Sequence, residues 1–215
     1  MASEIDAYFA SRLEHDPRRA ILWSTLWDAY FSRLIDDSDT VLDLGAGHCS
    51  FINAVRARVR IATDHWQGTT EYASPGVRVH IGDITDLQWL EDQTVDFAFA
   101  SNVFEHLTRD QLQSVLSQLL LKLRPKGKLC LVQPNYRYCS KEYFDDYTHV
   151  SVFSHISLSD FLSANGFRVV RSEPRFLPLT IKSRLPIHRA LIKAYLALPL
   201  KPLAKQMLIL AEPNR

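Results

Sequence analysis

The sequence is poor in cysteine and has no long apolar run. Its three cysteines, Cys49, Cys130 and Cys139, are odd in number and form no Cys-x-x-Cys pair, so neither a disulfide framework nor a zinc motif is expected. No apolar run reaches the roughly 18 residues that a membrane-spanning helix needs. The N-terminal stretch MASEIDAYFASRLEHD is charged and amphipathic, unlike a secretory signal peptide. These absences predict a soluble, cytoplasmic protein with reduced thiols.

An overall excess of charge is also missing. The formal net charge of +1 gives no general attraction for nucleic acid. The segment 174–211 nevertheless contains no acidic residue and is basic. No alternation of basic and aromatic residues indicates a surface for single-stranded RNA, so a nucleic-acid partner is not expected. The basic residues of this segment are Arg175, Lys182, Arg184, Arg189, Lys193, Lys201 and Lys205.

The pattern that is present alternates strands with helices. The 215 residues, 47% of them apolar, suffice for one α/β domain with a single core. The alternation predicts a Rossmann-like, doubly wound sheet of seven strands, mostly parallel and covered by helices on both faces. The last two strands lack a full crossover between them, which favours an antiparallel C-terminal strand. The expected strands are 40–44, 59–63, 78–81, 95–100, 128–133, 167–172 and 206–212, and the expected helices are 4–14, 18–35, 48–56, 109–123, 157–166 and 187–198.

A division of this single domain, 1–215, follows from the same pattern. An N-terminal helical cap is expected over 1–36, where Asp16 and Pro17 give a helix-start signal. A ligand-binding core is expected over 37–133. A substrate loop at 134–158 and a basic helical insertion at 174–205, before the last strand, are expected to cover it.

A glycine-rich turn follows the first expected strand in VLDLGAGHCSF. Gly45 and Gly47 allow the backbone to approach a ligand closely, and the expected helix 48–56 would aim N–H groups at it. Asp43, two positions before the first glycine, repels a pyrophosphate but attracts a sulfonium or ammonium group. Asp64 ends the next strand, where a carboxylate can accept both ribose hydroxyls. The expected ligand combines a ribose with a cationic amino-acid part, as S-adenosyl-L-methionine does, and a dinucleotide is the disfavoured alternative.

Over most of its length the chain resembles the class I S-adenosylmethionine-dependent methyltransferases. VLDLGAGHCSF is similar to their first motif, with Cys49 where many members have a third glycine. GDITDL resembles their adenine segment, which implies that Asp83 bonds the exocyclic amine and Ile84 packs on the ring. VDFAFASNVFEHL and LRPKGKLCLVQPN resemble their fourth-strand and fifth-strand motifs. The residues expected to bind the cofactor are Asp43, Gly45, Ala46, Gly47, Asp64, His65, Asp83, Ile84, Ser101 and Asn102.

Methyl transfer to a hydroxyl needs a base, and two histidines are candidates. His149 lies in the loop YFDDYTHVSVFS, where Asp145 or Asp146 could hold one tautomer of its ring. A capped loop with a surface histidine is the alternative. His106 follows the fourth strand, where a structural or cofactor-orienting role is favoured over catalysis. No metal is expected, although Asp145, Asp146 and His149 could together hold one.

The acceptor is expected between the loop 134–158, the basic segment 174–205 and the N-terminal helices. QPNYRYCSKEYFDDYTH and PRFLPLTIKSRLP resemble a bacterial branch of the family often encoded with surface-polysaccharide assembly enzymes. That resemblance implies a sugar acceptor in a glycan or a lipid-linked intermediate. A small hydroxylated metabolite, a lipid, and a non-enzymatic membrane-associated scaffold are the alternatives. The side chains expected to bind the acceptor are Asn135, Tyr136, Tyr143, Tyr147, Arg175 and Lys182.

The expected helix 187–198 is basic and amphipathic. A helix of this kind can lie on an anionic membrane surface, here the inner membrane. Its apolar stripe could instead pack on the sheet or on a partner chain, and a dimer stays open. The stripe consists of Ile187, Ala190, Leu191, Ala194 and Leu198, with Arg189 and Lys193 off it.

Overall fold

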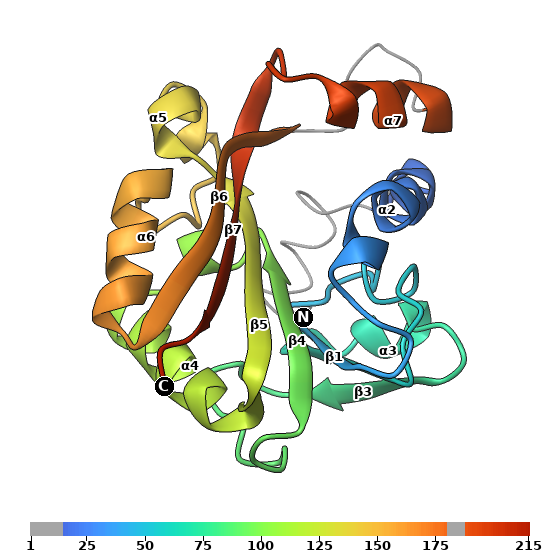
Figure 1. Cartoon of the computed structure of the whole chain (residues 1–215), viewed down its shortest axis with the longest axis vertical. Helices are drawn as coiled ribbons and strands as arrows, with labels where there is room; N and C mark the ends of the chain where they lie inside the picture. Colours follow the sequence, from blue (N-terminus) through green and yellow to red (C-terminus); the bar gives the residue numbers. More distant parts are fainter. Residues whose placement is uncertain (1–14, 180–187) are drawn as a thin grey trace, which may run out of the picture.

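One sheet organises the computed structural model, which describes residues 15–179 and 188–215. Within these residues seven strands pair in the order β3-β2-β1-β4-β5-β7-β6 (Figure 1). The expected helix 4–14 lies outside the described residues. The strands are β1 (Thr40–Leu44), β2 (Val59–Asp64), β3 (Val77–Ile81), β4 (Val95–Ser101), β5 (Leu123–Pro134), β6 (Phe167–Pro178) and β7 (Ala204–Pro213).

The strand directions confirm the expected Rossmann-like fold. Strands β1 to β5 run parallel, and β7 lies antiparallel between β5 and β6. From β1 the chain passes to β2 and β3 on one side and to β4 and β5 on the other. Ligands of open α/β sheets bind at this kind of switch point, beyond the carboxyl ends of the strands.

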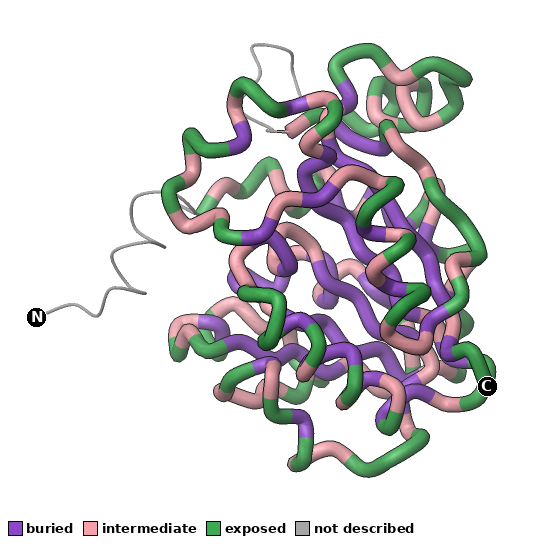
Figure 2. Tube along the Cα trace, turned by 90° about the vertical axis from the view of Figure 1, so that its left-hand side faces the viewer, coloured by how far each residue is buried: buried purple, intermediate pink, exposed green. Residues whose placement is uncertain are grey.

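Helices cover both faces of the sheet (Figure 1). On one face α4 and α6 pack on Leu42, Leu44 and neighbouring strand residues, and on the other α2 packs on Val41 and Phe99. Buried residues follow the strands through the middle of the molecule (Figure 2). The α-helices are α2 (Arg18–Ala29), α3 (Thr69–Tyr72), α4 (Arg109–Lys122), α5 (Tyr136–Cys139), α6 (His155–Ala164) and α7 (Arg189–Ala197), and the 3₁₀ turns are η1 (Phe31–Arg33), η2 (Phe104–His106) and η3 (Tyr143–Asp145).

Two expected helices differ from the prediction by more than two residues at one end or in form. The prediction of a helix at 48–56 is wrong, because residues 47–54 form successive turns. Cys49 has a φ of 54°, and a left-handed residue interrupts a right-handed helix. The helix expected over 18–35 ends at Ala29, because Tyr30 leaves the helical region with a φ of −135°. At its start the carboxylate of Asp16 accepts the N–H of Arg18 at 2.9 Å, in agreement with the expected start signal.

The apolar stripe expected around α7 faces solvent at Ala190, Leu191, Ala194 and Leu198, while Ile187 lies outside the described residues. Leu191 and Leu198 are 54% and 43% exposed, whereas Leu196 packs against the core on the α2 side. Arg189 joins α7 to α2 through the hydroxyl of Ser24 at 3.2 Å and the carboxylate of Asp28 at 3.5 Å. Among the described residues, no helix combines the length and the apolar character needed to span a bilayer.

Candidate functional site

The glycine turn lies at the carboxyl end of β1, beside the switch point of the sheet. The N–H groups of Gly45 and Ala46 both donate to the carbonyl of Thr63 on β2, at 2.9 and 3.1 Å. Gly45 has a φ of 66°, and a Cβ there would lie 2.5 Å from Cγ2 of Val103. A side chain at this position would therefore be strained in conformation and would clash with the segment after β4.

Asp64 fixes the same turn from the end of β2. Its Oδ2 accepts the N–H of Gly47 at 2.8 Å and its Oδ1 accepts the N–H of Trp66 at 2.9 Å. The side chain is buried, so the carboxylate holds the turn and the following loop together. Each carboxylate oxygen can accept a further bond, which keeps the expected contact with ribose hydroxyls chemically open.

Asp43 is buried beneath the turn with 3% of its surface exposed. Burial raises the pKa of this carboxyl well above its usual value, and the nearby Asp64 raises it further, while a backbone hydrogen bond from Ile52 opposes the rise. Both raising effects disfavour the charged form. A cationic group bound at the turn would offset them, so the site is complementary to positive charge.

Aromatic rings surround the turn, a feature that motif reasoning missed. The ring of His48 meets Tyr72 edge-on with centroids 4.4 Å apart and Trp66 at 5.1 Å. His15 stacks on Tyr72 at 5.0 Å. Burial lowers the pKa of His48 to about 4, so its ring is neutral at pH 7. In the sequence, Trp66 and Tyr72 follow β2, but aromatic residues at this spacing match no specific motif.

The remaining expected cofactor residues occupy different environments along the same edge. Asp83 is exposed and its Oδ1 accepts the N–H of Thr85 at 2.8 Å, whereas Ile84 belongs to the core. His65 is exposed, and Ala46, Ser101 and Asn102 are half-buried. Asn102 has a φ of 55°, and its side-chain oxygen accepts a bond from Gln206 on β7 at 2.8 Å. The tip of β4 is thereby tied to the antiparallel strand.

Two histidines meet beyond the end of β4. The rings of His106 and His149 are 4.8 Å apart between centroids. Thr148 donates its hydroxyl to Asp146 at 2.6 Å and lies 2.8 Å from Nδ1 of His106, so it accepts the His106 N–H. Nδ1 of His149 lies 2.6 Å from the carbonyl of Tyr143. The backbone carbonyl of Tyr143 thus orients the ring of His149, whereas the sequence predicted that Asp145 or Asp146 would orient it. Asp146 instead orients His106, through the hydroxyl of Thr148.

Glu105 lies beside these histidines and was absent from the sequence-based site. Its side chain is fully buried, and neither carboxylate oxygen has a hydrogen-bond partner among the described residues. Burial raises its pKa to about 8, although its own backbone N–H opposes the rise, and the charge of Asp146 adds a smaller increase. Its backbone carbonyl accepts the N–H groups of Val150 at 2.9 Å and Ser151 at 3.0 Å. A charged residue in the apolar stretch NVFEHL was the available signal.

The residues expected to bind the acceptor divide into buried and accessible groups. Asn135 is fully buried and donates to the carbonyl of Pro174 at 2.9 Å. Tyr143 is also buried, with its hydroxyl bonded to the Ser151 carbonyl at 2.5 Å, so both side chains are hydrogen-bonded within the fold. Tyr147 is 66% exposed. The other accessible candidates are Tyr136, half-buried, with Asp145 and Arg175, both exposed, while Lys182 lies outside the described residues.

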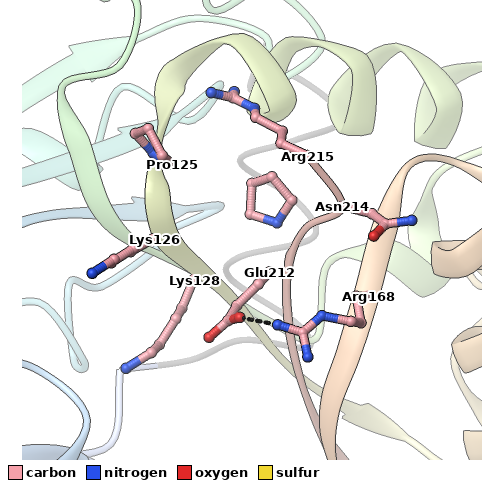
Figure 3. Close-up of a pocket in the computed structure, with 8 residues that line it drawn as sticks. Pro125, Lys126, Lys128, Arg168, Glu212, Asn214 and Arg215 are labelled. Atoms are coloured by element: carbon pink, nitrogen blue, oxygen red, sulfur yellow. Dashed lines mark hydrogen bonds and ion pairs between the residues drawn. The ribbon is translucent and has the colours of Figure 1, made fainter.

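A basic depression lies at the opposite end of the sheet. It encloses about 500 Å³ and is lined by residues from the start of β5, the start of β6 and the C-terminus. Arg168 pairs there with Glu212 at 2.8 Å (Figure 3). Because the crevice of the fold lies at the carboxyl ends of the parallel strands, this depression is separate from the glycine turn.

Known proteins show the same fold and a family match. A family model described as a methyltransferase domain matches residues 14–172, and no curated protein matches significantly. A chain from a complex between the Haloferax volcanii Trm112 methyltransferase activator and a methyltransferase has a TM-score of 0.71 at 16% identity, with 100% of both chains covered.

Two further solved structures are similar. A SAM-dependent methyltransferase from Archaeoglobus fulgidus has a TM-score of 0.69 at 19% identity, covering 98% of this chain and 100% of that one. The mitomycin 7-O-methyltransferase MmcR has a TM-score of 0.62 at 14% identity, covering 90% of this chain and 53% of that one. The match of the family model over most of the chain, on this fold and with this glycine turn, shows that the chain belongs to the class I S-adenosylmethionine-dependent methyltransferases.

Proposed function

We propose that this methyltransferase transfers the methyl group to a hydroxyl of a sugar in a glycan or lipid-linked glycan intermediate. The observation that carries the proposal is the pair His106 and His149, 4.8 Å apart beyond the end of β4. A sugar hydroxyl is a weak acid and needs a base in the transition state. An imidazole whose Nδ1 is held by a carbonyl, as in His149, presents Nε2 as that base.

The proposal divides the work between parts of the chain. Residues 37–133 bind S-adenosyl-L-methionine, with Asp64 on the ribose and Asp43 near the cationic methionine portion. The cofactor carries the activated methyl group, so the protein supplies alignment and a proton acceptor. The loop 134–158 and the segment 174–205 bind the acceptor. The exposed Tyr147 offers a ring face to a sugar, and the exposed Arg175 offers a positive charge to an anionic one.

A lipid acceptor is the second candidate, favoured by the apolar residues near α7. Leu191, Leu198, Leu200 and Leu203 are all substantially exposed. The same segment of the chain carries the basic residues Arg189 and Lys193. This combination suits the boundary between lipid tails and anionic head groups.

The test combines binding and turnover. Isothermal titration with S-adenosylhomocysteine should show affinity in the micromolar range that is lost in Asp64→Ala, and unchanged affinity would contradict the ribose assignment. Label transfer from S-adenosylmethionine to nucleotide sugars, lipid-linked sugars and lipids identifies the acceptor. His149→Ala should lose transfer while keeping S-adenosylhomocysteine binding, and His80→Ala, changed far from the pair, should keep both. Full transfer by His149→Ala would remove the proposed base.

A further inference from the structure

Three ligand-type side chains converge beside the expected acceptor site. One carboxylate oxygen of Glu105 and one ring nitrogen each of His106 and His149 all lie within 4.8 Å of one another. Zinc holds such atoms at about 2.0–2.2 Å in a tetrahedral arrangement, so two ligand atoms on one ion lie about 3.4 Å apart. Side-chain movements of about an ångström would therefore bring all three atoms to one cation.

A positive charge nearby would stabilise the buried carboxylate of Glu105. The carboxylate is fully buried, and neither oxygen is hydrogen-bonded within the described part of the chain. An isolated buried carboxylate costs several kcal/mol by order of magnitude unless it is neutralised or paired. Both neighbouring histidines are only half-buried, so the cluster is open to solvent on their side. A divalent cation entering there would compensate the carboxylate.

The histidine tautomers fit the same role. The Nδ1 atoms of both rings face acceptors, Tyr143 O for His149 and the hydroxyl of Thr148 for His106. With the proton on Nδ1, the lone pair of each ring lies on Nε2. Metal-binding histidines commonly donate the other ring N–H to a carbonyl or carboxylate, which fixes the tautomer and the ring orientation. Asp146, through Thr148, supplies the carboxylate end of such a chain.

We propose that Glu105, His106 and His149 bind a divalent first-row transition-metal cation, such as zinc or manganese. Two imidazoles and one carboxylate suit these ions and leave coordination positions open. Binding of the ion itself does not depend on the acceptor. Only its role in methyl transfer rests on the proposed function.

In that role the cation binds the acceptor hydroxyl and lowers its pKa. The hydroxyl proton leaves to solvent, and a lone pair of the oxygen forms the bond to the methyl carbon. The bond between methyl carbon and sulfur breaks, and its electron pair stays on sulfur to give S-adenosylhomocysteine. With the cation bound, His149 is its ligand, and the lowered pKa of the hydroxyl replaces the proton transfer to Nε2 of His149 that the proposed function assigns to the cation-free protein.

The test is titration of the chelator-treated full-length protein with Zn²⁺, Mn²⁺ and Co²⁺. We expect one equivalent of at least one ion to bind, with Co²⁺ giving visible absorption bands of mixed nitrogen and oxygen ligation. Glu105→Gln and His149→Ala should each weaken binding at least tenfold. His80→Gln, which removes a histidine outside the cluster, should bind as the parent does.

Three outcomes would overturn the proposal: no ion binds, Glu105→Gln binds unchanged, or His80→Gln accounts for the loss. If Glu105→Gln fails to fold, Glu105→Leu, which buries no polar group, takes its place. S-adenosylhomocysteine binding, measured on the same samples, separates the two proposals. Intact cofactor binding without cation binding refutes the cation site alone, whereas absent cofactor binding in the parent protein contradicts the proposed cofactor contacts.

Discussion

At the scale of single residues, Asp43 and Asp64 form a buried acidic pair that favours ligand binding over stability. Asp64 makes two hydrogen bonds with backbone N–H groups. Asp43 sits in a fully buried position where burial and Asp64 both raise its pKa. A strongly perturbed acid such as Asp43 is typical of a functional site. Its buried charge costs the free protein stability, and a cationic ligand bound beside it would offset that cost.

Replacing Asp43 should stabilise the free protein and weaken cofactor binding. A carboxyl whose pKa is raised on folding binds more protons in the folded state, so stability falls as pH rises from about 4 through the folded pKa. Asp43→Asn removes that loss of unfolding free energy, which amounts to about 1.4 kcal/mol for each unit by which folding raises the pKa of Asp43. Thermal unfolding of the free protein at pH 5 and pH 8 should show a larger gain at pH 8.

The same variant should bind S-adenosylmethionine roughly tenfold more weakly, a change of about 1.4 kcal/mol. Asp37→Asn, at an exposed position, should change neither quantity. A stability gain that does not grow with pH would contradict the assigned cause, and unchanged affinity would show that Asp43 does not attract the cationic part of the cofactor.

Some residues of the site could be predicted from the sequence, and others could not. The glycines and the two aspartates could be read from VLDLGAGHCSF and VRIATD, because their types and spacing are tied to one ligand chemistry. Glu105 could not, because a single acid in an apolar run gives no sign of what will lie beside it. Its contact with His149 bridges residues more than forty positions apart, which only the folded chain brings together.

At the scale of elements, α6 was expected over 157–166 but begins at His155, because a cap forms earlier in the chain. At the start of α6 the hydroxyl of Ser154 accepts the N–H of Ser157 at 3.2 Å, and the hydroxyl of Ser157 accepts the N–H of Ser154 at 2.9 Å. This reciprocal capping box fixes the start of α6. It also follows directly the loop that carries His149.

Removing the cap should therefore loosen the end of that loop. Ser154→Ala is expected to lower the free energy of unfolding by about 1 kcal/mol, the usual cost of a lost N-cap. Urea denaturation measures the change. Ser163→Ala, near the other end of α6, is the matched control and should cost less than half as much. Equal effects of the two substitutions would show that the cap does not stabilise α6.

Helix periodicity was less reliable around the glycine turn. The segment 48–56 has helical spacing of apolar residues, and Phe51, Ile52 and Val55 are indeed buried. Its backbone nevertheless forms turns, because Cys49 is left-handed. The side chain of Asn53 donates to the carbonyl of Tyr72 at 2.8 Å, which ties the segment to α3. Burial periodicity followed from the sequence, whereas the backbone conformation depended on tertiary contacts.

At the scale of the whole molecule, α7 lies beside α2 (Figure 1), and the ion pair between Arg189 and Asp28 joins the two helices. The basic residues Arg189 and Lys193 flank the exposed Leu191 and Leu198. Contact of a basic amphipathic helix with an anionic surface combines burial of apolar area with electrostatic attraction. Peripheral membrane contact through this region stays a prediction.

Vesicle binding tests that prediction. The protein should co-sediment with vesicles containing phosphatidylglycerol and less with neutral vesicles. The double substitution Leu191→Gln with Leu198→Gln should reduce co-sedimentation several-fold, with a stability change within about 0.5 kcal/mol because both side chains are exposed. Leu121→Gln, at an exposed position on α4, should bind as the parent does. Equal binding of all three proteins would exclude α7 as the contact.

The sequence by itself determined the alternation of strands and helices, the antiparallel last strand and the glycine turn with its two acids. Each of these depends on local periodicity, on turn chemistry or on a motif within a few residues. Only the tertiary structure decided that Glu105 is buried beside His106 and His149, that Asn135 and Tyr143 are buried, and that Leu191 and Leu198 face solvent. Those features depend on which segments, distant in the sequence, pack against one another. This packing determines how far a side chain is buried, and therefore its protonation state and its partners.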